Sequence, residues 1–231
     1  MISPSPPTKE IRRRTVRSFV QRDGRLTKAQ KNAIEKLLPI YRLKITRSRS
    51  FFDVFKNLGP VILEVGSGDG TTILEMARKY PLRNFIACEV YKSGIGKTLA
   101  SIDVQGLTNI QIANLDVLEL LENIPLHSLE LAMIFFPDPW PKARHAKRRL
   151  VNDSFLRLIM KRMRKNGRVL IATDEAGYAD QILDIADKSK YCRNLIGRRL
   201  YSSRPSWRPI TNFEGRARKL QNQVWEIALC S

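Results

Sequence analysis

The chain has 231 residues, 43% of them hydrophobic, and can therefore bury a substantial core. Its formal net charge of +19 at pH 7 exceeds what solubility requires and favours a polyanion as partner. Three widely spaced cysteines, two histidines and no apolar run long enough to span a bilayer argue against disulfides, a metal centre and a membrane anchor, so we expect a soluble, cytoplasmic protein that needs no metal.

The N-terminal region is rich in Ser and Pro and then in Arg. This composition predicts a basic flexible arm over residues 1–25, ordered on a partner, ahead of a single domain over residues 26–231. The sequence TKAQKNAIEKLLP then predicts an amphipathic helix with Thr27 as its N-cap and Pro39 as its stop. A second, short helix is expected over residues 51–56.

Short apolar strands alternate with helical segments in the rest of the chain. The expected strands are VILEV, FIACEV, NIQIAN, LELAMIFF and RVLIATD. Helices are expected in TTILEMARKYP, from about Lys92 to Val104, in LDVLELLENI and in YADQILDIADKS. This alternation predicts a parallel sheet covered on both faces. The last segment, QVWEIAL, predicts a strand that can add antiparallel to an edge of the sheet.

A glycine-rich turn, GSGDG at residues 66–70, follows the first expected strand, where the backbone can approach a ligand closely. Its spacing differs from the dinucleotide pattern GxGxxG, and the nearby acids Glu64 and Asp69 disfavour a pyrophosphate. Glu89 ends the second strand, where a carboxylate can accept both ribose hydroxyls, and Asp116 follows the third, within reach of an adenine amino group. Glycines with acids and no phosphate binder predict S-adenosylmethionine as cofactor, bound by Glu64, Gly66, Gly68, Glu89 and Asp116.

The charge distribution agrees with two different ligands. Residues 51–141 carry 6 Lys and Arg against 11 Asp and Glu. Residues 1–50 carry 14 Lys and Arg against 3 Asp and Glu, and residues 142–231 carry 21 Lys and Arg against 8 Asp and Glu. The two basic flanks suit phosphates, whereas the acidic middle suits a neutral or cationic group.

The sequence FFPDPWPKARHAKRR begins at Phe135, at the carboxyl end of the fourth expected strand. Two prolines flank Asp138 and fix φ on both sides, so its carboxylate lies on a stiff turn and can accept from the amino and imino edge of a base. Trp140 offers a face for stacking. A dense set of cations follows, suited to phosphate contacts: Lys142, Arg144, Lys147, Arg148 and Arg149.

With these motifs the chain resembles the bacterial tRNA (guanine-N7)-methyltransferases over nearly its whole length, from RTVRSFVQRDGRLTKAQ to VWEI. FFPDPWPKARHAKRR resembles the most distinctive signature of that family. The resemblance implies a Rossmann-like class I methyltransferase fold of the α/β class, with a mostly parallel seven-stranded sheet, an antiparallel edge strand and helices on both faces. It also implies a monomer or homodimer, S-adenosylmethionine as methyl donor, and guanosine 46 in the variable loop of tRNA as acceptor.

The resemblance assigns roles to individual residues. Asp138 is implied as the catalytic residue and as part of the cofactor site. Substrate contacts are implied for Lys142, Asp174, Thr211, Asn212, Phe213 and Glu214. The chain departs from the family pattern at Pro141, where members carry a basic residue or histidine, and at Asn212, where they carry lysine.

Guanine N7 presents an in-plane lone pair, so alignment is expected to dominate over base catalysis. Three alternatives stay open. The chain could methylate another base or an exocyclic nitrogen, it could be a non-catalytic basic RNA-binding protein on the same fold, or it could be a nicotinamide dehydrogenase. Mapping the methylated atom would identify methylation of another base or of an exocyclic nitrogen. The intact set of acids disfavours a non-catalytic RNA-binding protein. The position of Gly70, one residue earlier than in GxGxxG, disfavours a dehydrogenase.

Overall fold

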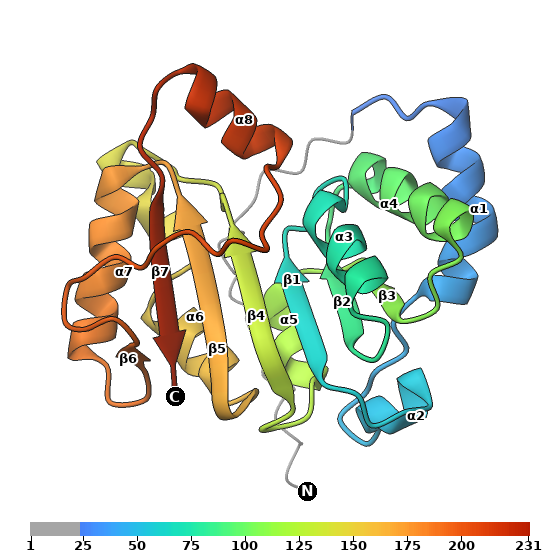
Figure 1. Cartoon of the computed structure of the whole chain (residues 1–231), viewed down its shortest axis with the longest axis horizontal. Helices are drawn as coiled ribbons and strands as arrows, with labels where there is room; N and C mark the ends of the chain where they lie inside the picture. The colour runs from blue at the N-terminus through green and yellow to red at the C-terminus, as the bar shows by residue number, and fades with distance from the viewer. Residues whose placement is uncertain (1–23) are drawn as a thin grey trace, which may run out of the picture.

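A computed structural model describes residues 24–231, so almost all of the arm predicted over residues 1–25 lies outside the described residues. A seven-stranded sheet forms the centre, with the strand order β3-β2-β1-β4-β5-β7-β6 (Figure 1). β7 is antiparallel to both of its neighbours, and the other pairs are parallel. The strands are β1 Val61–Val65, β2 Asn84–Cys88, β3 Ile110–Ala113, β4 Leu129–Phe135, β5 Met163–Thr173, β6 Arg193–Asn194 and β7 Trp225–Cys230.

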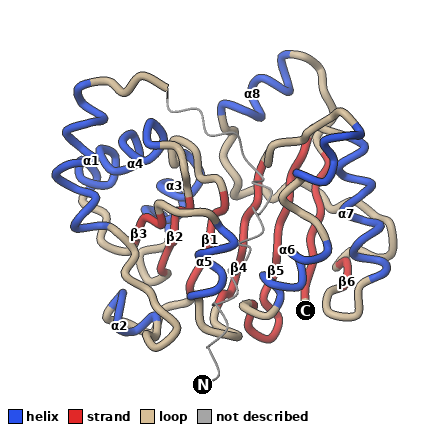
Figure 2. Tube along the Cα trace, turned by 180° about the vertical axis from the view of Figure 1, so that it is seen from behind, coloured by secondary structure: helices blue, strands red, loops and turns tan. Residues whose placement is uncertain are grey.

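Helices cover both faces of the sheet, as seen in Figures 1 and 2. One face carries α1 Lys28–Tyr41, α3 Thr71–Lys79 and α4 Lys92–Gln105. The other face carries α2 Phe51–Phe55, α5 Val117–Asn123, α6 Asp153–Met160 and α7 Ala176–Lys188. The short 3-10 helix η1 Ala143–Arg148 follows β4, and α8 Asn212–Lys219 lies above the carboxyl ends of the parallel strands. The predicted α/β class with a mostly parallel sheet is therefore confirmed.

Successive side chains of the central strands point to opposite faces of the sheet and so belong to two different core clusters. On β1, Ile62 packs with α1, α3 and α4, whereas Leu63 packs with α5, α6 and α7. All five β1 residues are buried, because helices cover both faces of the sheet. This arrangement leaves the strand ends as the places where polar side chains reach solvent or a ligand.

Two predicted boundaries need correction. α1 begins with a capping box between Thr27 and Gln30, as its N-cap predicts, but it continues through Pro39 to Tyr41. The missing proline N–H removes one hydrogen bond in the last turn, and Arg42 N still donates to Leu38 O at 2.9 Å to close the helix. β5 begins at Met163, five residues before the predicted start.

Several elements of the structure were not indicated by sequence patterns, although the six strands predicted from them are present. β7 pairs antiparallel with β5 as expected, and a strand of two residues, β6, pairs with its outer side. So short a strand has no hydrophobic alternation of its own. The helices η1, α6 and α8 were also not predicted; α8 has only one buried apolar residue, Ala217.

Candidate functional site

A cavity of about 470 Å³ lies at the carboxyl ends of β1, β2, β3 and β4. Its walls come from the turn after β1, the start of α4, the turn after β4 and the start of α8. Nine of the twelve predicted site residues line it: Glu64, Gly66, Gly68, Glu89, Asp116, Asp138, Thr211, Asn212 and Phe213. The fold thus brings the predicted cofactor residues and part of the predicted substrate residues into one space.

The turn between β1 and α3 exposes its backbone to this cavity. Gly66 and Gly68 have φ angles of +71° and +56°, which favour glycine. A Cβ at either position would meet no atom within 4 Å, so these two positions border open space. α4 packs directly onto the same turn, because a Cβ at Gly94 would lie 2.2 Å from Gly68 O. This close approach explains the glycine at the start of α4.

Two buried carboxylates lie beside the glycine turn. Glu64 is 4% exposed, and its Oε2 has no hydrogen-bond partner among residues 24–231. Burial, with a smaller contribution from the Glu89 carboxylate, raises the pKa of Glu64 to about 8. Glu89 Oε2 accepts from Gly68 N at 2.7 Å, and its Oε1 accepts from the next two backbone N–H groups. Burial nevertheless raises the pKa of Glu89 as well.

Asp69 is neutralised by its surroundings. Lys97 Nζ on α4 lies 2.9 Å from Asp69 Oδ2, and Asn212 Nδ2 on α8 donates to the same oxygen at 3.0 Å. Partial burial opposes it, but Lys97 and the Thr71 hydroxyl lower the pKa of Asp69 below its usual range. Asp69 therefore already has a cationic partner in Lys97.

The turn after β4 holds Asp138 at the cavity wall. Phe136 and Trp140 on either side have φ angles of +53° and +43°, and such left-handed backbone costs roughly 1–2 kcal/mol for each residue. Phe136 N donates to Ala172 O at 2.8 Å, and Arg149 Nε donates to Pro139 O at 2.8 Å. One backbone hydrogen bond and one from the Arg149 side chain thus fix this turn in addition to its prolines.

Trp140 and Arg149 of the sequence FFPDPWPKARHAKRR make contacts within the protein. Trp140 is not among the cavity-lining residues; its ring contacts the guanidinium of Arg148 at 4.9 Å and the His145 ring at 5.7 Å. Arg149 is 7% exposed and donates to backbone and side-chain oxygens of the turn and of α7, so its expected phosphate contact is wrong. The other four cations are exposed: Lys142, Arg144, Lys147 and Arg148.

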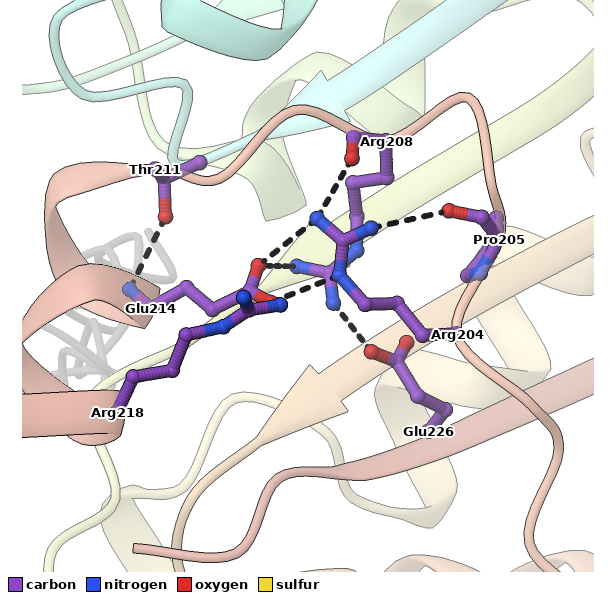
Figure 3. Close-up of polar contacts among 7 residues, drawn as sticks. All are labelled: Arg204, Pro205, Arg208, Thr211, Glu214, Arg218 and Glu226. Carbon is purple, nitrogen blue, oxygen red and sulfur yellow. Dashed lines mark hydrogen bonds and ion pairs between the residues drawn. The ribbon is translucent and has the colours of Figure 1, made fainter. Parts of the chain in front are cut away.

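Three predicted substrate residues lie outside the cavity lining. Lys142 is exposed just before η1, and Asp174 is half-buried after β5. Glu214 is 1% exposed, and its carboxylate pairs with three arginines, which Figure 3 shows. A role of Glu214 toward a substrate would therefore act through this network.

Comparisons with known proteins identify the family. The profile of a family described as "Putative methyltransferase" matches residues 58–227. The tRNA (guanine-N(7)-)-methyltransferase of Xanthomonas campestris pv. campestris is 41% identical, over 97% of this chain and 87% of the relative. The corresponding enzyme of Yersinia enterocolitica is 40% identical, over 93% of this chain and 90% of the relative. The chain belongs to the tRNA (guanine-N7)-methyltransferase family.

A solved structure agrees with the fold of this methyltransferase. The antibiotic-resistance methyltransferase Kmr aligns with a TM-score of 0.56 at 14% identity, over 82% of this chain and 94% of that chain. The cavity also fits the methyl donor of the family, S-adenosylmethionine. Its glycine turn leaves open space where a Cβ would stand, and its buried Glu64 has an unpartnered oxygen suited to a cationic group.

The methyltransferase has cavity residues that the sequence did not indicate. Gln30 on α1 lines the cavity and donates from Nε2 to Ser93 O at 3.1 Å, and Arg216 on α8 lines it as well. The one available signal is the pair of glycines in KSGIGKT, because a Cβ at Gly96 would lie 2.9 Å from Gln30. Within residues 24–231, no cluster of His, Cys, Asp and Glu could hold a metal ion, and no helix has the length and apolar composition to cross a membrane.

Proposed function

We propose that this methyltransferase transfers the methyl group of S-adenosylmethionine to N7 of a guanine in tRNA, at guanosine 46 of the variable loop. One observation carries the proposal: a single cavity joins the acidic glycine turn to the Asp138 turn and the start of α8. The first group of residues suits a cationic donor, and the second suits a purine. The names of the relatives support tRNA and guanine N7 for this chain.

The donor side of the cavity would hold a cation through carboxylates. When bound, S-adenosylmethionine supplies an electrophilic methyl group on a positively charged sulfur. Glu64 would accept hydrogen bonds from its ammonium group, Glu89 from its ribose hydroxyls, and Asp116 from its adenine amino group. These contacts lie in a partly buried space, where electrostatic interactions are stronger than in bulk water.

The acceptor side would orient guanine with Asp138. Its carboxylate would accept from the N1 and N2 hydrogens of the base, which fixes the ring and raises its electron density. N7 already carries a lone pair, so no proton has to leave before transfer. The methylated ring becomes positively charged, and the Asp138 carboxylate would stabilise that charge as it develops. Positioning of the reacting atoms can contribute about 7–11 kcal/mol.

The surface around this cavity supports a polyanionic substrate. Lys142, Arg144 and Lys147 are exposed on or beside η1, in the segment that follows Asp138, and can contact phosphates near the reacting base. We place the enzyme in the cytoplasm, as a monomer or homodimer that works without a protein-bound metal. Three free cysteines support a reducing compartment.

Product identification tests the proposal. The enzyme is incubated with unmodified tRNA and methyl-labelled donor, and the digested nucleosides are separated by mass spectrometry. We expect 7-methylguanosine at position 46. A label on an exocyclic nitrogen, on another base, or on no nucleoside would contradict the proposal.

A matched pair of variants tests the role of Asp138. Asp138→Asn keeps the size of the side chain but removes the charge, and we expect turnover at saturating donor and tRNA to fall at least about 100-fold. Asp103→Asn makes the same change at an exposed position of α4 and should leave turnover intact. Near-normal turnover in Asp138→Asn would refute the role of the charge.

A further inference from the structure

Arg208 is the largest side chain that is fully buried, with 2% of the residue exposed. Burial lowers the pKa of its guanidinium, although Glu226 and Glu214 oppose this shift and arginine stays protonated in proteins. Arginine is almost never fully buried unless it is paired. The partners of Arg208 therefore indicate why a charge lies inside the protein here.

Two carboxylates from different elements pair with Arg208 (Figure 3). Its Nη1 lies 2.9 Å from Glu214 Oε2 on α8, and its Nη2 donates to Glu226 Oε1 on β7. Arg204 joins the same network, because its Nε donates to Glu214 Oε1 at 2.7 Å and its Nη2 donates to Arg208 O at 2.6 Å. The segment before α8, which crosses the sheet in Figure 1, is thus tied to α8 and to β7.

The guanidinium of Arg208 also packs against the end of β4. Its central carbon lies 4.8 Å from the ring centroid of Phe135 and 5.8 Å from that of Phe136. Both rings line the cavity, and they precede Asp138 by three and two residues. Because cation–π contacts strengthen when the cation is desolvated, this buried contact supports the residues that lead into the Asp138 turn.

The Asp138 turn needs such support. Left-handed backbone at residues other than glycine persists only where the surroundings fix it, and Phe136 and Trp140 both have positive φ angles. Arg149 holds the far side of the turn through its hydrogen bond to Pro139 O. Arg208 contacts the near side through Phe136.

The same guanidinium fixes the opposite wall of the acceptor side. The Thr211 hydroxyl caps α8 by accepting from Glu214 N at 3.2 Å, so the first turn of α8 includes the carboxylate that Arg208 binds. Thr211, Asn212 and Phe213 line the cavity beside this cap. Arg208 therefore contacts the support of Asp138 on one side and the start of α8 on the other.

We propose that Arg208 is a positioning residue for methyl transfer, which fixes the Asp138 turn relative to the first turn of α8 and so orients the base. The proposal rests on the proposed function for the identity of that base. Stability alone is a weak reason for the network, because apolar residues of similar volume often replace a buried ion pair without loss of stability. Arginine suits the role because a planar guanidinium stacks on rings and pairs with two carboxylates at once.

Arg208→Lys tests the proposal, because it keeps the charge and removes the planar group. We expect the rate of methyl transfer at saturating tRNA and donor to fall about 10–100-fold, since a displacement of about 1 Å can cost that much. The affinity for S-adenosylhomocysteine should stay within about threefold, because Arg208 lies outside the donor side. Arg199→Lys is the matched control, at a half-exposed arginine that pairs with Asp184 on α7, and should change neither quantity.

A second variant keeps the test decisive if Arg208→Lys folds poorly. Arg208→Met combined with Glu226→Gln removes one buried charge pair while it retains most of the volume, and thermal unfolding gives the folded fraction used to normalise the rates. Hydrogen exchange is then measured by mass spectrometry in both variants. Exchange should rise in peptides covering residues 134–142 and 209–216 and stay unchanged in the glycine turn, residues 64–75.

Each outcome decides the proposal. An unchanged rate per folded molecule, an equal loss of S-adenosylhomocysteine affinity, or a uniform rise of exchange along the chain would overturn it. If the wild-type enzyme methylates a different atom or base, the proposed function fails, whereas the exchange pattern still tests whether Arg208 holds the two walls together.

Discussion

Binding of the methyl donor should release a proton from Glu64. This carboxyl group is buried at the end of β1, where burial, together with the nearby Glu89 and Asp69 carboxylates, raises its pKa to about 8. At pH 7 a group with that pKa is about 90% protonated. A cation beside it favours the ionised form, so donor binding should release about 0.9 proton at pH 7.

The same pKa sets the pH dependence of donor affinity. If the donor binds tightly only to ionised Glu64, affinity rises about tenfold per pH unit below pH 8 and about 50-fold from pH 6 to pH 8. In the donor-free protein the folded pKa lies above the usual 4.5. The contribution of Glu64 to folding stability is therefore full below about pH 4.5 and is lost as pH rises through about 8.

Titration calorimetry measures the released proton directly. Binding enthalpies at pH 7 are compared in two buffers with different ionisation enthalpies, for the wild type and for Glu64→Gln. We expect the variant to bind the donor without proton release, whereas Glu119→Gln, at an exposed site of α5, should behave as the wild type does. A wild-type enthalpy that is independent of the buffer would refute the ionisation of Glu64 on binding.

Two further predictions concern the arginines and the basic flanks. Arg149→Met should lower the free energy of unfolding by about 1–3 kcal/mol in urea denaturation, because the buried guanidinium is lost and its partly buried hydrogen bonds to Pro139 O and Gly177 O are broken. Lys147→Met, at an exposed position, should change the free energy of unfolding by less than about 0.5 kcal/mol. Equal effects would contradict the buried role. Deletion of residues 1–25 should weaken tRNA binding and flatten the slope of log affinity against log salt, with donor affinity unchanged. A flat slope already in the full chain would show that the flanks do not bind phosphates.

Local signals predicted the framework of the sheet. Short apolar segments that alternate with amphipathic helical ones indicated β1 to β5. A strand in the middle of a parallel sheet is apolar throughout, because helices cover both of its faces. Thr27 was predicted as an N-cap from its place before an apolar helical pattern, and the structure confirms it. The position of Asp138 at the mouth followed from topology, since residues after a parallel strand lie at the carboxyl edge of the sheet.

Pairings between distant residues could not be predicted in this way. Lys97 and Asp69 are 28 residues apart, and Asn212 and Asp69 are 143 residues apart, so no short-range spacing indicates that they meet. The sequence KARHAKRR likewise does not show that Arg149 is buried and Arg148 is exposed, because the burial of Arg149 depends on its contacts with α7. Arg208 lies in a segment without a helix or strand pattern, so the sequence does not indicate that it is buried. Its partners on α8, on β7 and at the end of β4 are known only from the structure.

The burial of charges explains how a chain with a net charge of +19 can hold a cation in its cavity. Exposed cations such as Lys142 and Arg144 act through solvent, where their field is screened beyond about 10 Å at 0.1 M salt. Glu64 and Glu89 are buried, so their interaction with a group in the cavity is screened much less. The phosphates of a bound tRNA would stay at the surface with the cations, and only the base would enter the acidic space. Added salt should therefore weaken tRNA binding steeply while it leaves donor binding nearly unchanged.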